Sequence, residues 1–226
     1  MALTNEKFIL ALYGSQARGD ADELSDIDIL SIGNEPRSLS AYDGNVATSV
    51  SHYNWVEFRA MHQYGSLFLW HLKTQASPVE YNSTGLAEYT RLMETLPEYK
   101  RSSKDIEAFR HSLKDVRQAL DSDDAGLEFE LSSLATTVRH SCILGCYLAR
   151  KPEFGRYSSV RAFCEIAGLP SEIADEFQHL YQFRMMVERN KEAPSRCGLD
   201  AYADYCLAWS EEIVEEVAKC YEQICA

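Results

Sequence analysis

No cysteine precedes Cys142, and all seven cysteines of this 226-residue chain lie between Cys142 and Cys225. Cys142 and Cys146 are four residues apart, but no second pair follows them at the spacing of a zinc finger. The number is odd, and the N-terminus does not read as a signal peptide. We therefore expect reduced thiols buried in the core of a cytoplasmic protein.

Basic residues are also scarce, with 22 Lys and Arg against 35 Asp and Glu and a net charge of −13. Broad, non-specific binding to DNA or RNA needs basic surface that displaces counterions, so this composition argues against it. A small-molecule substrate or a basic protein partner fits the charge at least as well. No apolar run approaches the roughly 18 residues of a membrane span, and we expect a soluble protein that does not enter a membrane.

Strand patterns occur only in the first part of the chain. Three short apolar or β-branched segments predict strands, and three helical patterns follow them. The first of these helices is capped by Asn54, and the last begins at Ser83 and stops at Pro97. From Glu98 onward the apolar residues recur at helical spacing in about five segments. The sequence therefore predicts an α+β protein, with a small mixed-sheet domain over residues 1–97 and an all-helical bundle over residues 98–226.

One stretch between the first two predicted strands carries the chemistry, "GSQARGDADELSDID". The Gly14–Ser15 pair follows a strand, and Asp26 and Asp28 open the next one. Alternation along a strand places the two carboxylates on one face, where they repel each other unless a cation lies between them. Mg²⁺ prefers a few carboxylates together with phosphate oxygens. A glycine lets the backbone approach a phosphate, and Ser15 adds a hydroxyl and a backbone N–H at a predicted helix start.

These parts together predict a nucleoside triphosphate held through its metal ion. The alternative is a capped surface hairpin whose acids have no function. The stretch Gly14 to Asp28 resembles the nucleotidyltransferases of the DNA polymerase β superfamily, in particular the minimal and antibiotic-modifying members. The helical half is similar, in pattern only, to a HEPN-like or kanamycin-nucleotidyltransferase-like bundle.

The resemblance implies roles for individual residues. Gly14 and Ser15 would bind the triphosphate, and the catalytic Asp26 and Asp28 would ligate Mg²⁺ or Mn²⁺. An acceptor hydroxyl would attack the α-phosphorus of a nucleoside triphosphate, most simply ATP, and pyrophosphate would leave. Two further residues are candidates for the nucleotide site, Arg18 at the γ-phosphate and Ser25 as an orienting hydroxyl. Each has an alternative interpretation, as loop surface for Arg18 and as a turn residue for Ser25.

The sequence departs from the family at one place. The family usually supplies a third carboxylate from the next strand, but that strand reads "VATSVSHY". Thr48 or Ser49 stands at the expected position, and Glu57 and Glu80 are possible substitutes for the acid. Two hypotheses therefore remain: an active nucleotidyltransferase, or a catalytically weakened nucleotide-binding or antitoxin-like partner protein. The acceptor (a small molecule, a tRNA or a protein), the identity of the nucleotide and the oligomeric state are left open.

One locally basic stretch interrupts this acidic chain. It comprises Arg139, His140, Arg150, Lys151, Arg156 and Arg161. These residues either meet a phosphate or RNA, or are ordinary cations at helix ends. Arg184 has no histidine a few residues after it, so no ribonuclease activity of the HEPN type is assigned.

Overall fold

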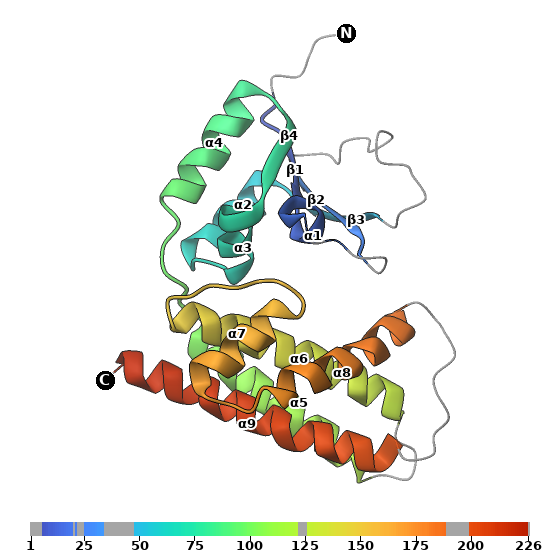
Figure 1. The fold of residues 1–226 in the computed structure, drawn as a ribbon. Coiled ribbons are helices and arrows are strands. Elements are labelled where there is room, and N and C mark those ends of the chain that lie inside the picture. The colour runs from blue at the N-terminus through green and yellow to red at the C-terminus, as the bar shows by residue number, and fades with distance from the viewer. Residues whose placement is uncertain are drawn as a thin grey trace. The chain divides into compact units, whose positions relative to one another are not determined.

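The computed structural model describes residues 6–19, 21, 25–33, 48–121, 126–188 and 199–225. The chain divides into two compact units, residues 1–100 and residues 101–226 (Figure 1). The domain boundary expected at Pro97 from the sequence stays a prediction, and each unit is described by itself.

The first unit is built on a four-stranded mixed sheet in the order β3-β2-β1-β4. Strand β1 (Ile9–Tyr13) is antiparallel to both β2 (Ile27–Ile32) and β4 (Ser77–Tyr81). Strand β3 (Thr48–Tyr53) runs parallel to β2 along the other edge. The short helix α1 (Gly14–Arg18) follows β1 directly. The remaining helices of this unit are α2 (Trp55–Gln63), α3 (Leu67–Gln75) and α4 (Ser83–Glu94).

The three predicted strands are present, and β4 is an addition to them. Its second residue is Pro78, which the sequence pattern does not associate with a strand. Proline lacks the N–H that a central strand needs, but an edge strand tolerates it, and β4 is an edge strand. The sequence predicts that α4 begins with Ser83 as its capping residue. The helix does begin at Ser83, but its cap is Asn82, whose side chain accepts a hydrogen bond from Gly85 N, 2.8 Å away.

One face of the sheet carries the core of this unit. Ile9, Ala11 and Tyr13 of β1 point to the same side, and their register partners on β2 are Ile32, Leu30 and Asp28. All of these except Asp28 belong to one buried cluster with residues from α2, α3 and α4. This face therefore changes along its length from an apolar core to a carboxylate at the end where α1 begins.

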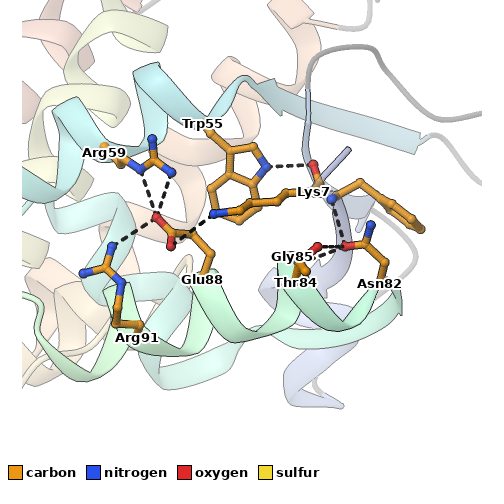
Figure 2. A network of polar contacts seen from close by, with 9 residues as sticks. Lys7, Trp55, Arg59, Asn82, Thr84, Gly85, Glu88 and Arg91 are labelled. Atoms are coloured by element: carbon orange, nitrogen blue, oxygen red, sulfur yellow. Dashed lines mark hydrogen bonds and ion pairs between the residues drawn. The ribbon is translucent and has the colours of Figure 1, made fainter. Parts of the chain in front are cut away.

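A polar network fixes α2 and α4 to the segment that leads into β1 (Figure 2). Asn82 Oδ1 accepts from Phe8 N at 3.4 Å, and Trp55 Nε1 donates to Lys7 O at 2.8 Å. On α4, the Glu88 carboxylate forms ion pairs with Arg59 at 2.9 Å and with Arg91 at 3.0 Å. The network fixes the start of β1, and Gly14 directly follows the end of this strand.

The second unit is a helical bundle. Its helices are α5 (Ser102–Leu120), α6 (Leu127–Leu148), α7 (Ser158–Ala167), α8 (Glu172–Glu188) and α9 (Leu199–Cys225). Helix α6 contacts each of the other four helices of this unit (Figure 1). Most of its residues are buried. The close packing is visible at Gly145, where a Cβ would collide with the ring of Phe163 on α7.

The α+β class is confirmed, with a small mixed sheet first and helices after it. Six cysteines fall in the described ranges, and all six are free thiols, four of them buried. Over those same ranges no helix has both the length and the apolar character that crossing a membrane requires.

Candidate active site

The site is built at the end of β1, where Gly14 meets Asp28. The antiparallel register pairs Tyr13 with Asp28, so the next residue, Gly14, lies beside the Asp28 carboxylate. Gly14 has a φ of 73°, in the left-handed region that favours glycine. A Cβ at Gly14 would also collide with Oδ2 of Asp28. The Gly-Ser turn and the second acid of the Asp-Ile-Asp motif are therefore in direct contact.

The other predicted residues lie on the segments around this contact. Asp26 immediately precedes β2 and is half-buried, as Asp28 is. Ser25 is buried at 8% exposure, which a plain surface turn would not require. Ser15 is half-buried on α1. Because Asp26 and Asp28 are two residues apart in extended chain, they share the face that carries Tyr13.

Arg18 is held by helix α3. Its Nη1 donates to Oε1 of Gln75 at 2.8 Å, and the same oxygen lies 2.7 Å from Nε2 of His71. Because an arginine can only donate, the Gln75 atom must accept, and Nε2 is then the protonated nitrogen of His71. The guanidinium is thus positioned from a second element instead of moving freely at the end of α1.

Tyr13 connects the acid to strand β3. Its hydroxyl lies 2.8 Å from Ser51 Oγ, and its ring meets the rings of Phe68 and His71 edge-on, with centroids 5.6 Å apart. Burial raises the pKa of Tyr13 and the Asp28 charge raises it further, although the Ser51 hydrogen bond lowers it. Tyr13 is therefore a neutral phenol near pH 7 and does not serve as a base.

The register of β3 shows which residue, Thr48 or Ser49, stands where the family usually has its third carboxylate. Ser49 pairs with Asp28, so its side chain points to the same face as the acid. Thr48 pairs with Ile27, and its side chain points to the opposite face. Of the two residues left open by the sequence, Ser49 is the one next to Asp28.

The two substitute acids, Glu57 and Glu80, both lie away from Asp28. Glu57 completes a capping box, in which its Oε2 accepts from Asn54 N at 2.8 Å at the start of α2. Glu80 is on β4, at the far edge of the sheet from β3, and pairs with Leu10, whose side chain points away from the Asp28 face. Neither carboxylate is placed beside Asp28.

The donor set fits a divalent cation of the Mg²⁺ type. Two carboxylates on adjacent positions of one face supply hard oxygen ligands, and the missing Cβ of Gly14 leaves the Asp28 oxygen room against the turn. Within the described ranges no three His, Cys, Asp or Glu residues gather as a closed metal cage. Two protein carboxylates with the remaining ligands from phosphate and water is the arrangement that Mg²⁺ usually has in nucleotide sites.

Sequence reasoning missed three residues of this site, Tyr13, His71 and Gln75. His71 and Gln75 are four residues apart on one face of α3, a spacing that was available in the sequence. Nothing in the sequence alone, however, indicates that this face meets α1. The sequence predicts Tyr13 only as the last residue of a buried strand, and its contact with Ser51 depends on the order of the strands.

Comparison with known proteins agrees with this geometry. Residues 5–76 match the nucleotidyltransferase domain family. The N-terminal part of the chain is therefore a nucleotidyltransferase domain, and the match does not extend into the helical unit. A search of curated proteins found no match to this chain.

Proposed function

We propose that this chain transfers a nucleoside monophosphate, AMP from ATP, to a hydroxyl of a small molecule, an RNA or a protein. The observation that carries the proposal is the contact between Gly14 and the Asp28 carboxylate. It brings the turn that would bind phosphate and an acid that would bind the metal ion together on one pair of strands, inside the segment that matches the nucleotidyltransferase domain.

Asp26 and Asp28 would hold Mg²⁺ or Mn²⁺. When bound, such an ion would neutralise negative charge on the triphosphate and stabilise the attacking and leaving oxygens. Gly14 and Ser15 would bind phosphate through backbone N–H groups and the Ser15 hydroxyl. The Arg18 guanidinium, held by Gln75 at 2.8 Å, would attract the γ-phosphate, and Ser25 would orient the neighbouring acid.

In the proposed reaction the acceptor oxygen forms a bond to the α-phosphorus. The bond from this phosphorus to the oxygen that bridges it to the β-phosphate breaks, and pyrophosphate leaves. The hydroxyl proton passes to solvent, because the register partner of Asp28 on the described part of β3 is Ser49 and not a carboxylate.

The test is a transfer assay with each nucleoside triphosphate in turn, read by mass spectrometry of the acceptor pool and by release of pyrophosphate. Wild-type protein should release pyrophosphate in Mg²⁺ and stop when EDTA is added. The double change Asp26→Asn, Asp28→Asn should abolish release, whereas the matched change Asp204→Asn on the exposed side of α9 should not. Release by the double variant at the wild-type rate would place the site elsewhere.

A second function is favoured by one observation, the serine at the position beside Asp28. A domain with Ser49 there would bind Mg²⁺ and nucleotide but transfer slowly, as a catalytically weakened nucleotide-binding or antitoxin-like partner protein. This alternative would be supported if nucleotide binding depends on Asp26 and Asp28 but the protein releases no pyrophosphate with any acceptor extract that is added.

A further inference from the structure

An exposed hydroxyl stands beside the Asp28 carboxylate, on Ser49 of strand β3. Strand β3 is parallel to β2, and Ser49 is the register partner of Asp28, so the two side chains point to the same face of the sheet. Neighbouring strands lie only about 4.8 Å apart. Ser49 is exposed to solvent, and Asp28 is half-buried. A ligand bound to the Asp28 carboxylate would therefore lie next to the Ser49 hydroxyl.

The other hydroxyls near this acid are turned away or engaged. Thr48 precedes Ser49 and points to the opposite face of the sheet. Ser51 shares the face of Ser49, but its Oγ lies 2.8 Å from the hydroxyl of Tyr13, which is only 7% exposed. Among the described residues of β1, β2 and β3, Ser49 thus offers the hydroxyl that is both exposed and directly beside Asp28.

This placement suits an acceptor of the transferred nucleotide. A Mg²⁺ ion on Asp28 would lie about 2.1 Å from a carboxylate oxygen and would bind phosphate oxygens on its other side. The α-phosphorus of the nucleotide would then lie within a few ångströms of the neighbouring strand, and attack needs the oxygen at about 3–3.5 Å. An acceptor fixed on that strand reacts as if it were present at a very high concentration. Serine at this position therefore supplies an accepting oxygen where a carboxylate would supply a base.

We propose that Ser49 is itself an acceptor, and that the chain transfers a nucleoside monophosphate to its own serine. The inference rests on the proposed function. The Ser49 Oγ forms a bond to the α-phosphorus, and the bond from this phosphorus to the oxygen bridging it to the β-phosphate breaks. Pyrophosphate leaves with the bonding electron pair, and the hydroxyl proton passes to solvent. The product is a serine phosphodiester, and the reaction stops at one nucleotide per chain because this position holds one hydroxyl.

The experiment incubates the full chain with Mg²⁺ and each nucleoside triphosphate in turn, with no added acceptor, and follows the intact mass of the protein. Wild-type protein should gain the mass of one nucleoside monophosphate, and peptide fragmentation should place the gain on Ser49. EDTA should prevent it. A triphosphate with a methylene group in place of the oxygen between its α- and β-phosphates should give no gain, because the bond that must break is absent.

Matched variants test the assignment to one hydroxyl. Ser49→Ala should abolish the mass gain, because the accepting oxygen is removed. Thr48→Ala removes the adjacent hydroxyl on the opposite face and should leave the gain unchanged. Ser49→Thr keeps a hydroxyl and should be modified, more slowly because of the added methyl group. Both positions are exposed, and circular dichroism identifies any variant that fails to fold. Fragmentation of the wild-type product locates the modified residue without any variant.

A mixing experiment tests whether the transfer occurs within one chain. The double variant Asp26→Asn, Asp28→Asn should stay unmodified when it is incubated with wild-type protein and nucleotide. Its modification at Ser49 would overturn transfer within the chain and show transfer between chains instead.

The outcomes separate this inference from the proposed function. Pyrophosphate release with an acceptor extract, while the mass of the chain stays constant, would leave the proposed function standing and overturn the role of Ser49. A gain that persists in Ser49→Ala, or that fragmentation places on another residue, would also overturn that role. If no nucleotide gives either pyrophosphate or a modified chain, the proposed function and this inference are both wrong.

Discussion

Gly14 is subject to two separate demands. Its φ of 73° is one that residues with a side chain rarely adopt, and a Cβ would meet the Asp28 carboxylate. Gly19 at the other end of α1 has a φ of 78° but no atom within 4 Å of a built Cβ. Substitutions at Gly14 and Gly19 can therefore distinguish the effect of backbone strain, present at both, from a collision with the Asp28 carboxylate, present only at Gly14.

We expect Gly14→Ala to weaken Mg²⁺-dependent nucleotide binding by at least tenfold, because the new Cβ displaces the Asp28 carboxylate. Both Gly14→Ala and Gly19→Ala should lower the free energy of unfolding by about 1–2 kcal/mol, because each puts a side chain on a residue with a positive φ. Gly19→Ala, however, should bind nucleotide normally. Ser15→Ala should have a smaller effect than Gly14→Ala, since the backbone N–H remains. Titration with a fluorescent ATP analogue and thermal unfolding measure the two effects separately. Equal binding by the two alanine variants at the glycine positions would show that contact with Asp28 is irrelevant.

Ser49 is the second position where a single residue decides the outcome. If the site lacks only a base, Ser49→Asp should raise pyrophosphate release by about 10² to 10⁴-fold, the usual contribution of a general base. The increase follows because Ser49 shares the face of Asp28 and is its register partner.

Thr48→Asp is the control for Ser49→Asp, because Thr48 is adjacent in sequence but points to the opposite face. It should leave pyrophosphate release unchanged. If wild-type protein already turns over at ordinary enzyme rates and Ser49→Asp only impairs it, strand β3 is not where the acid is needed. Segments outside the described residues would then be tested next.

At the scale of elements, the sequence predicted those whose patterns are local. Three strands, the helix after Gly14, the cap at Asn54 and the bundle helices all follow from periodicity and from capping residues. Strand β4 was missed, because Pro78 breaks the strand pattern and only its edge position makes it acceptable. The distinction between Ser49 and Thr48 also lay beyond the sequence, because it depends on which residue of β2 each one pairs with.

The ion pairs of Glu88 on α4 with Arg59 on α2 and with Arg91 should make the stability of the protein depend on pH. Hydrogen bonds from Arg91 and then Arg59 lower the pKa of Glu88 to about 2, against the opposing effect of burial. Because the pKa of Glu88 is lower in the folded state than in the unfolded state, its ionised form stabilises the folded protein at pH values above the unfolded pKa of about 4.3. This contribution is lost as the pH falls from about 4.3 towards 2.

Glu88→Gln should therefore lower the free energy of unfolding at pH 7 by about 1–2 kcal/mol, since charge-assisted bonds to Arg59 and Arg91 are lost. The variant and the wild type should converge as the pH approaches 2. Urea unfolding from pH 7 to pH 2 measures both effects, with the exposed Glu94→Gln on the same helix as a control. A constant difference between Glu88→Gln and wild type across this range would show that the ionised form contributes nothing.

For the whole molecule, ligand binding and stability are linked. A nucleotide that binds only the folded protein stabilises it by about 2.7 kcal/mol at 100-fold excess over the dissociation constant. We expect ATP or another nucleoside triphosphate to raise the melting temperature in Mg²⁺ and not in EDTA. The double change Asp26→Asn, Asp28→Asn should remove this increase without unfolding the protein. An increase that survives the double change would mean that nucleotide and metal bind at another place.

Helix α6, in contact with all four other helices of its unit, has a consequence for backbone exchange. Its amide hydrogens, around Leu134, Val138 and Cys142, can reach solvent only when several helices separate at once, since these side chains are fully buried. Deuterium should therefore enter the middle of α6 last in the bundle, at a rate set by cooperative opening of that unit. The two edge strands of the sheet, β3 and β4, each have a neighbour on one side only and should take up deuterium far sooner.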